Sequence, residues 1–215
     1  MSDEQLPCEK EWLDCTRCDL HKTRTRVVIG YGSRRAKLMF IGEGPGGLED
    51  EEGRPFVGPA GELFDDYLRH LKLSRDNIML NNIVACRAFI QEDDGSRRDR
   101  PPKKPEILAC KDRLLEAIYT VDPVLIVAMG SVAFKALTGE TTSITKARGG
   151  IYEMKVPGWE AEEITYNVLA TFHPSYLKRN PQERRKNGSI WEQFLDDLSL
   201  AVQMVEIADE RYSRR

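Results

Sequence analysis

Four short apolar runs divide the chain, and each has the length and the branched or aromatic side chains typical of a β-strand. They lie at residues 37–41, 77–84, 123–129 and 166–172. The first and third runs are almost continuously apolar, a pattern typical of strands that are covered on both faces. The hydrophobic pattern therefore predicts a buried and mainly parallel sheet.

Between and after these runs, apolar residues recur at the spacing of amphipathic helices. Residues 60–72, 105–119 and 189–206 carry such stripes, and residues 131–138 predict a short helix with Ser131 as its cap. Strands that alternate with helices are typical of an α/β fold.

Two segments between the predicted elements read as irregular. Residues 43–59 contain eight glycines and prolines, and residues 90–105 are polar and rich in proline at their end. The chain has 215 residues without a repeat or an evident linker. We therefore expect one domain over residues 1–215, with 1–14 and 207–215 peripheral.

The net charge of −3 excludes a uniformly basic protein that coats DNA, since 32 Lys and Arg residues are balanced by 35 Asp and Glu residues. The charges are nevertheless segregated. Basic residues gather within 20–42, 97–104 and 178–186, whereas acidic residues gather within 2–14, 160–163 and 192–210. A phosphate-facing surface on a near-neutral protein would have this distribution, and solvated loops are the alternative.

No apolar stretch reaches the roughly 18 residues that a membrane-spanning helix requires, so we expect no membrane association. The first five residues are polar and acidic, unlike a signal peptide. We therefore expect a cytoplasmic protein, in which disulfides are disfavoured.

In a reducing compartment, grouped cysteines indicate metal ligands or buried thiols. Cys15 and Cys18 form a CxxC pair, Cys86 follows the second apolar run, and Cys110 lies in the next predicted helix. Two close and two distant thiolates can hold either zinc or an iron–sulfur cluster, and the spacing does not choose between them. Buried free thiols are the alternative, and Cys8 has no assigned role.

Polar or glycine residues lie at the ends of all four apolar runs: Glu43, Asn82, Gly130 and His173. Ligands of open α/β sheets bind outside the carboxyl ends of the strands, so these positions predict one shared cleft. The alternative is that they are ordinary turn residues. His173 precedes a proline at a strand end, which makes it a candidate for an acid or electrostatic role, with a structural core histidine as the alternative.

The loops after the first run add two features. Residues 42–46 form a glycine-rich turn that allows close backbone approach to a ligand but matches neither a dinucleotide fingerprint nor a phosphate-binding P-loop. Phe56 lies in a loop with proline on one side and glycine on the other, where it can stack on a planar ligand or cap the core.

Together these motifs resemble the uracil-DNA glycosylase superfamily, in particular its family 4, which carries an iron–sulfur cluster. The resemblance extends in order from about residue 15 to residue 196. It rests on the cysteines named above and on Gly42-Glu43-Gly44-Pro45-Gly46, Glu49-Asp50, residues 53–61, Asn82 with Cys86-Arg87, Arg148-Gly149 and His173-Pro174-Ser175-Tyr176-Leu177.

The resemblance implies a three-layer α/β/α fold around a central four-stranded, mainly parallel sheet. It implies a monofunctional hydrolase of base excision repair that flips uracil out of DNA and leaves an abasic site. The DNA substrate would be single- or double-stranded, and the enzyme a monomer. It also implies a structural [4Fe–4S] cluster on Cys15, Cys18, Cys86 and Cys110.

The resemblance further implies a role for each site residue. Phe56 would stack on the flipped uracil, Asn82 would read its edge, and His173 would stabilise the charge that develops at O2. Glu43 or Glu49 would position the attacking water or favour the cationic sugar, and the sequence does not rank them. Gly44 and Gly46 would allow close backbone approach. The expected DNA contacts are Leu177, filling the space that the base vacates, and Lys178, Arg179, Arg97, Arg98, Arg100 and Arg148.

The chain departs from the family pattern between Cys86 and Cys110. This segment, 87–109, is longer than in typical members, and Arg87-Ala88-Phe89 replaces the usual Arg-Pro-Pro. A related subgroup that attaches covalently to uracil-DNA uses a histidine in a basic insertion here, and this segment has none, so we expect ordinary turnover without an adduct. Excision of another deaminated or modified base, a weakly catalytic module that binds damaged DNA, and a zinc-only site remain alternatives.

Overall fold

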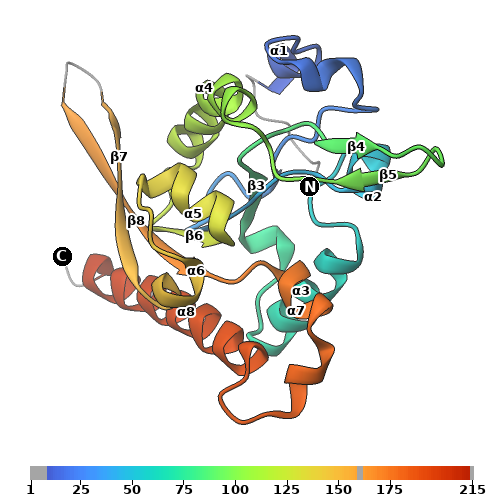
Figure 1. Cartoon of the computed structure of the whole chain (residues 1–215). Helices are drawn as coiled ribbons and strands as arrows, with labels where there is room; N and C mark the ends of the chain where they lie inside the picture. Colours follow the sequence, from blue (N-terminus) through green and yellow to red (C-terminus); the bar gives the residue numbers. More distant parts are fainter. Residues whose placement is uncertain (1–8, 159–161, 214–215) are drawn as a thin grey trace.

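The fold is described from a computed structural model, which covers residues 9–158 and 162–213 and places a six-stranded sheet between two groups of helices (Figure 1). The strand order is β1-β3-β2-β6-β8-β7. The bounds are β1 Tyr31–Gly32, β2 Leu38–Gly42, β3 Met79–Asn82, β6 Leu125–Met129, β7 Ile151–Pro157 and β8 Glu163–Thr171. The three-layer α/β/α fold is therefore confirmed.

The four inner strands, β3, β2, β6 and β8, run parallel and correspond to the four predicted apolar runs. Their register places Phe40 beside both Leu80 and Val127, and each of these side chains is at most 1% exposed. Strands that are covered on both faces need apolar residues at every position, which is why the continuous runs predicted them correctly.

The sheet also has two antiparallel edge strands, β1 and β7, beyond the four strands that were expected. Along β7 exposed Glu153 and Lys155 alternate with buried Met154 and Val156. One face of this edge strand meets the core and the other meets solvent, so its pattern is not a continuous apolar run.

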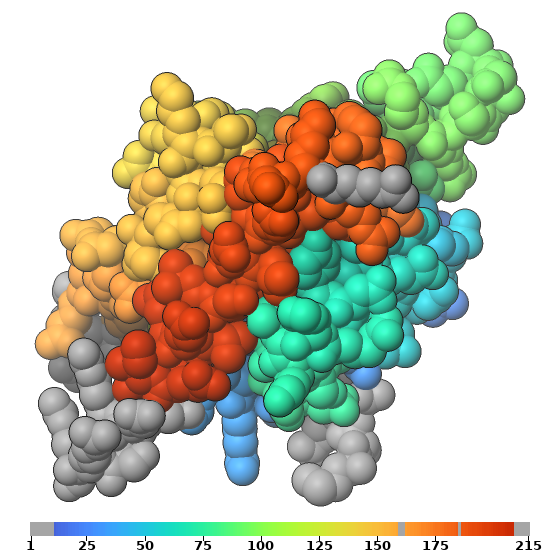
Figure 2. Space-filling view, turned by 90° about the horizontal axis from the view of Figure 1, so that it is seen from below, coloured from blue at the N-terminus to red at the C-terminus, as the bar shows by residue number. Residues whose placement is uncertain are grey.

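The irregular segments predicted at 43–59 and 90–105 contain regular structure. Helix α2, Gly47–Glu52, lies in the first, and strands β4, Phe89–Gln91, and β5, Arg97–Asp99, form an antiparallel hairpin that includes the start of the second. The residues of β5 are all exposed, so no hydrophobic pattern marks this strand. Figure 2 shows the hairpin, in light green, projecting from the molecule.

Helices cover both faces of the sheet, and their positions confirm the four predicted helical stripes. Helices α4, α5 and α6 pack on one face, and α3, α7 and α8 pack on the other. The bounds are α3 Pro59–His70, α4 Lys104–Val121, α5 Ser131–Thr138, α6 Ile144–Ala147, α7 Pro174–Arg179 and α8 Ile190–Ser213. Short helices complete the chain: α1 Glu9–Leu13 and the 3-10 turns Asp19–Lys22, Arg75–Asn77 and Pro181–Arg185. None of the helices in the described ranges is long and apolar enough to cross a membrane.

The strand order places a topological switch point at β2. After β2 the chain forms β3 on one side and later β6 on the other, so the connections leave β2 in opposite directions. In sheets of this kind a crevice opens outside the carboxyl ends of the strands at the switch point. The sheet thus brings the residues that follow β2, β3, β6 and β8 to one edge.

Candidate active site

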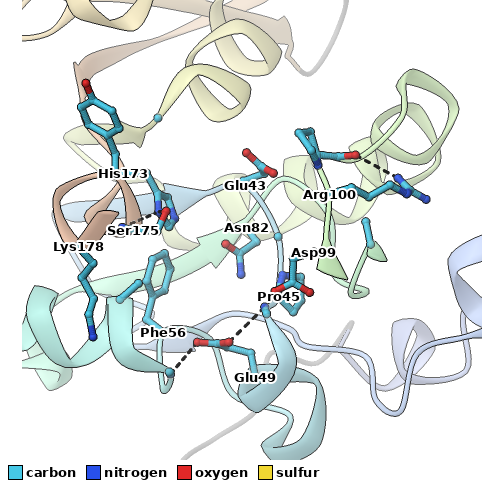
Figure 3. A pocket seen from close by; sticks show the side chains of 18 of the residues that line it. Glu43, Pro45, Glu49, Phe56, Asn82, Asp99, Arg100, His173, Ser175 and Lys178 are labelled. Carbon is cyan, nitrogen blue, oxygen red and sulfur yellow. Dashed lines mark hydrogen bonds between the residues drawn. The ribbon is translucent and has the colours of Figure 1, made fainter. Parts of the chain in front are cut away.

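A cavity of about 890 Å³ lies at this edge of the sheet. Glu43, Asn82, Gly130 and His173 all line it, so the shared cleft predicted from the four strand ends is confirmed. The volume falls within the range of small-molecule sites. Figure 3 shows the side chains of Glu43, Asn82 and His173, with that of Phe56, around one space.

Gly42, the last residue of β2, makes this convergence possible. A Cβ at this position would lie 2.6 Å from Asn82 Oδ1 and 2.7 Å from Phe56 Cζ, both closer than real Cβ contacts. The same Cβ would lie 3.5 Å from His173 Nε2. The missing side chain therefore lets three cavity residues meet beside the end of β2.

We expect Gly42→Ala to lower the rate of the reaction catalysed at this cavity by about a hundredfold, because displacement of catalytic groups by about 1 Å has this effect. Gly42 does not have a left-handed backbone conformation, so the added methyl acts through its contacts and not through backbone strain. The measurement is kcat together with the thermal unfolding midpoint. A loss of stability with unchanged kcat of the folded fraction would contradict this role.

Phe56 forms one wall of the cavity and also belongs to the core. Its ring stacks on the His173 ring with centroids 6.2 Å apart, and only 5% of the residue is exposed. The backbone has a left-handed φ of 57°, and the Arg75 guanidinium donates to the Phe56 carbonyl. A side chain at Gly61 would overlap this carbonyl, with a Cβ only 1.9 Å from it. The loop conformation is thus fixed from two sides.

Asn82 ends β3 and presents its amide to the cavity. The residue is 3% exposed, and its backbone N–H donates to Asn81 Oδ1 at 2.8 Å. Within the described residues, no hydrogen bond uses the Asn82 side chain, whereas the side chain of Asn81 is used. The Asn82 amide is therefore available to a ligand, and it can both donate and accept.

His173 caps α7, and its hydrogen bonds determine the tautomer of the neutral ring. Nδ1 accepts from the Ser175 N–H at 3.2 Å and lies 2.8 Å from Ser175 Oγ, which itself accepts from Arg179 at 3.1 Å. Burial and, as the smaller cause, the positive charge of Arg179 together lower the pKa of His173 to about 4. The ring is therefore neutral near pH 7 and carries its proton on Nε2, the nitrogen near Gly42.

The two candidate carboxylates differ in their surroundings. Glu49 Oε1 accepts from the Gly58 N–H at 2.7 Å and Oε2 from the Gly46 N–H at 3.1 Å, so this side chain ties two loops together (Figure 3). The Glu43 side chain has no hydrogen-bond partner among the described residues. Burial raises the pKa of Glu43 above its usual value, Arg179 opposes the rise and Asp99 adds to it. Glu43 is thus the carboxylate free to act on a ligand.

Both candidate glycines of the turn also line the cavity. A Cβ on Gly44 would lie 2.8 Å from Val84, and a Cβ on Gly46 would lie 2.9 Å from the Glu49 carboxylate. A larger residue at position 44 would displace Val84, and a larger residue at position 46 would displace the Glu49 carboxylate.

Most of the predicted DNA contacts surround the cavity mouth or lie on the hairpin. Lys178, Arg179 and Arg100 line the cavity, and Lys178 and Arg179 are exposed. Arg100 is held by Glu106 at 2.7 Å. Arg97 and Arg98 lie exposed on β5, where Arg97 packs over the Phe89 ring at 4.8 Å and Arg98 pairs with Glu92 at 2.6 Å.

The prediction that Arg148 contacts DNA is wrong in this structure. Its guanidinium is bound to the Asp197 carboxylate through two nitrogens and donates to the Gln193 carbonyl at 3.0 Å. Asp197 is 1% exposed, and a buried carboxylate requires a charged or hydrogen-bonding partner. Arg148 therefore joins the end of α6 to α8 and does not line the cavity.

The prediction that Leu177 fills the space left by the base is also wrong in this structure. Leu177 is fully buried among the side chains of α3 and α8. Because α7 is helical, the adjacent Tyr176 points differently, lines the cavity and is 39% exposed. No pattern in the sequence decides which side of this turn faces the core.

Leu177→Ala should therefore act on stability. We expect a loss of about 2–5 kcal/mol in the free energy of unfolding, the usual cost of truncating a buried leucine. Denaturant unfolding measures it, with Tyr176→Ala as the exposed neighbour for comparison. Weaker DNA binding with unchanged stability in Leu177→Ala would restore the original interpretation.

The four candidate ligand cysteines line a second, smaller cavity together with Trp12, Arg24 and Arg113. No disulfide joins them. Among the described residues, no three His, Cys, Asp or Glu side chains are placed to hold a metal ion, so the thiols surround the cavity without forming a coordination shell. Cys8 lies outside the described residues.

The surroundings of these cysteines are cationic. Arg24 donates to Cys86 Sγ at 3.5 Å, and Arg113 is buried beside the thiols. Burial raises the pKa of Cys86 to about 11 although Arg24 opposes the rise, so the free thiol is neutral and a poor nucleophile. Two guanidinium groups beside four cysteines suit a site that becomes anionic on binding a metal group.

Comparison with known proteins identifies a family for this chain. The family model of the uracil DNA glycosylase superfamily matches residues 29–199. A type-4 uracil-DNA glycosylase of Thermotoga maritima is 40% identical over 193 residues, which cover 89% of this chain and 90% of that protein. The type-4 enzyme of Sulfurisphaera tokodaii is 37% identical, and the match covers 82% of this chain and 77% of that protein. The type-4 enzyme of Archaeoglobus fulgidus is 33% identical, and the match covers 84% of this chain and 86% of that protein.

Proposed function

The chain belongs to the uracil-DNA glycosylase superfamily, and we propose that it excises uracil from DNA by hydrolysing the N-glycosidic bond. The observation that carries the proposal is the convergence of Asn82, Phe56, His173 and Glu43 on one cavity at the sheet edge. The products are free uracil and an abasic site, so the protein is a DNA-repair hydrolase.

Recognition of the base follows from two walls of the cavity. A uracil flipped out of DNA would stack on the Phe56 ring, which is held rigidly in its loop. The free amide of Asn82 would donate to O4 of uracil and accept from N3–H. Cytosine has a donor at the position of O4 and an acceptor at N3, so the same amide orientation disfavours it.

The chemistry requires stabilisation of two charges. When the C1′–N1 bond breaks, its electron pair moves to the base, and the neutral His173 ring would donate Nε2–H to the negative charge at O2. The carboxylate of Glu43 would favour the cationic sugar and accept a proton from the water that attacks C1′. Glu49 would act through the loops that it joins.

Contacts to DNA would come from the basic residues around the cavity mouth and on the hairpin. Phosphate contacts of this kind weaken as salt increases. The net charge of −3 is compatible with them because many of the acidic residues lie in other parts of the sequence, within 2–14, 160–163 and 192–210.

We further propose that Cys15, Cys18, Cys86 and Cys110 hold a [4Fe–4S] cluster. Four thiols around one cavity beside Arg24 and Arg113 support this assignment, since the guanidinium groups balance a negatively charged cluster. When bound, the group would supply structural cross-links between the N-terminal segment, the segment after β3 and α4, and it takes no part in the hydrolysis.

Removal of iron is expected to lower the thermal unfolding midpoint and to abolish the brown colour of the purified protein. Cys86→Ser should do the same, because a buried site that loses one ligand no longer holds the cluster. Iron and sulfide analysis with visible absorbance checks this result. A colourless protein that contains zinc would contradict the assignment and favour the zinc alternative.

The proposed function is tested with oligonucleotides that carry one uracil, single-stranded or paired with guanine or adenine. Alkali cleaves the strand at an abasic site, and the matched control carries thymine at the same position. We expect strand scission with uracil only. Cluster-loaded protein that cleaves none of the uracil substrates would contradict the proposal and favour a binding module.

A different target base is a second candidate because the hairpin contributes Asp99 to the cavity. Oligonucleotides with hypoxanthine or xanthine in the same assay decide between the bases.

On a denaturing gel we expect no slowly migrating protein–DNA species, since residues 87–109 hold no histidine. Such a species would show that turnover stops at a covalent adduct.

A further inference from the structure

Arg113, in α4, lies between the two cavities described above. It lines the cavity of the four cysteines, and its guanidinium also reaches the end of β3. The residue is 5% exposed. It lies three positions after Cys110 in the same helix, so both side chains point to the same side of α4.

The hydrogen bonds of Arg113 constrain both polar groups of the Asn82 backbone, the carbonyl directly and the N–H through Asn81. Nη2 donates to the Asn82 carbonyl at 2.5 Å. Nη1 donates at 2.7 Å to Asn81 Oδ1, the same atom that accepts the Asn82 N–H. The position of the Asn82 amide in the larger cavity thus depends on where the guanidinium lies.

The positive charge of Arg113 has no carboxylate partner in the described part of the chain. Its acceptors are carbonyl and amide oxygens of residues 81–83, and Nε is buried without a hydrogen-bond partner. A guanidinium remains charged in proteins, and a buried charge requires a compensating one. The four cysteines are the groups beside Arg113 that become anionic when they bind a metal group.

We propose that Arg113 is a positioning residue through which the charge on the four cysteines fixes Asn82 for reading the base. With the cysteines ligated, the guanidinium is balanced and holds the end of β3. With the cysteines as neutral thiols, the buried charge is uncompensated and the guanidinium or the strand end shifts. The inference rests on the proposed function, in which Asn82 reads uracil.

The test uses Arg113→Met and measures binding to an oligonucleotide with one 2′-fluoro-2′-deoxyuridine, whose glycosidic bond resists hydrolysis. The same oligonucleotide with thymine in that position gives the reference affinity. We expect cluster-loaded Arg113→Met to lose about tenfold in the uracil-to-thymine affinity ratio, as for a base contact weakened by about 1.4 kcal/mol. Lys111→Met, an exposed change in the same helix, should keep the wild-type ratio.

Removal of the cluster provides the second arm. The wild-type ratio should fall on removal to that of Arg113→Met, and the ratio of Arg113→Met should not fall further. Arg113→Lys should recover part of the ratio because it restores the charge without the two-nitrogen geometry. A wild-type ratio in loaded Arg113→Met, or equal losses in both proteins on cluster removal, would overturn the inference.

Asn81→Ala provides a second test if Arg113→Met does not fold or does not bind the cluster. It removes the atom that joins Arg113 to the Asn82 N–H but leaves the arginine and the cysteines in place. We expect the same loss of the affinity ratio, and an unchanged ratio in this variant would overturn the inference. A wild-type protein without preference for uracil would instead contradict the proposed function, whatever the variants do.

Discussion

Replacement of His173 by alanine is expected to lower kcat for uracil release by about a hundred- to a thousandfold, the usual effect of removing one donor to a developing oxyanion. Nδ1 is occupied by Ser175, so Nε2–H is the donor that faces the cavity. The donor is neutral, and its effect requires no protonation of the ring.

The pH dependence distinguishes this role from acid catalysis by a charged histidine. Because burial lowers the pKa of His173 to about 4, the ring stays neutral as the pH falls through the ordinary histidine value of 6.5. We therefore expect no inflection of kcat/KM near pH 6.5 in the wild-type protein. Single-turnover rates on the uracil oligonucleotide measure both results.

Two controls separate chemistry from folding. The unfolding midpoint of His173→Ala should stay close to that of the wild type, and Ser175→Ala, which removes one partner of Nδ1, should have a smaller effect on kcat. Equal losses of activity and stability in His173→Ala would instead identify the histidine as a structural residue of the α7 cap.

The sheet and the main helices were predictable because burial in the core requires apolar residues at regular positions along them. Residues 131–138 were predicted as a helix, and α5 has these bounds. The four parallel strands have apolar residues throughout because helices cover both of their faces. The edge strand β7 and the hairpin were missed because their residues meet solvent on one or more sides.

The cavity itself was predictable from topology, since parallel strands bring their carboxyl ends to one edge. The errors concern residues whose roles depend on distant partners. Arg148 pairs with Asp197, which lies 49 positions away, and no local pattern indicates that pairing. Leu177 and Tyr176 are adjacent, and only the packing of α7 against α3 and α8 decides which is buried.

Residues that support the site were missed for a related reason. Ser175 and Gly42 lie inside motifs that carry the family resemblance, but their roles come from contacts with His173 and Asn82 that spacing does not reveal. Arg113 did leave a signal in the sequence. It is a charged residue at helical spacing from Cys110, Leu114 and Ala117, so it falls on an otherwise apolar face of the predicted helix. A charge at that position is unusual unless it has a buried partner.

Glu43→Gln is expected to lower kcat by about a hundred- to ten-thousandfold, the range for loss of a general base. Burial raises the pKa of Glu43 above the ordinary value of 4.5. The carboxylate is the active form, so wild-type activity should rise as the pH increases through this raised pKa and fall below it. This fall in activity at low pH is the acidic limb of the pH profile. Glutamine does not titrate, so the residual activity of Glu43→Gln should lack the acidic limb.

Two further substitutions test whether the acidic limb of the pH profile comes from Glu43 or from Glu49. Asp99→Asn removes a negative charge that raises the pKa of Glu43, so the limb should move to lower pH. Glu49→Gln should retain the limb, because this carboxylate is held by the N–H groups of Gly46 and Gly58 and acts through the loops. The measurement is the rate on the uracil oligonucleotide from about pH 4 to pH 9 in each protein. A limb that persists in Glu43→Gln and disappears in Glu49→Gln would assign the water-activating carboxylate to Glu49 and reverse the roles proposed here.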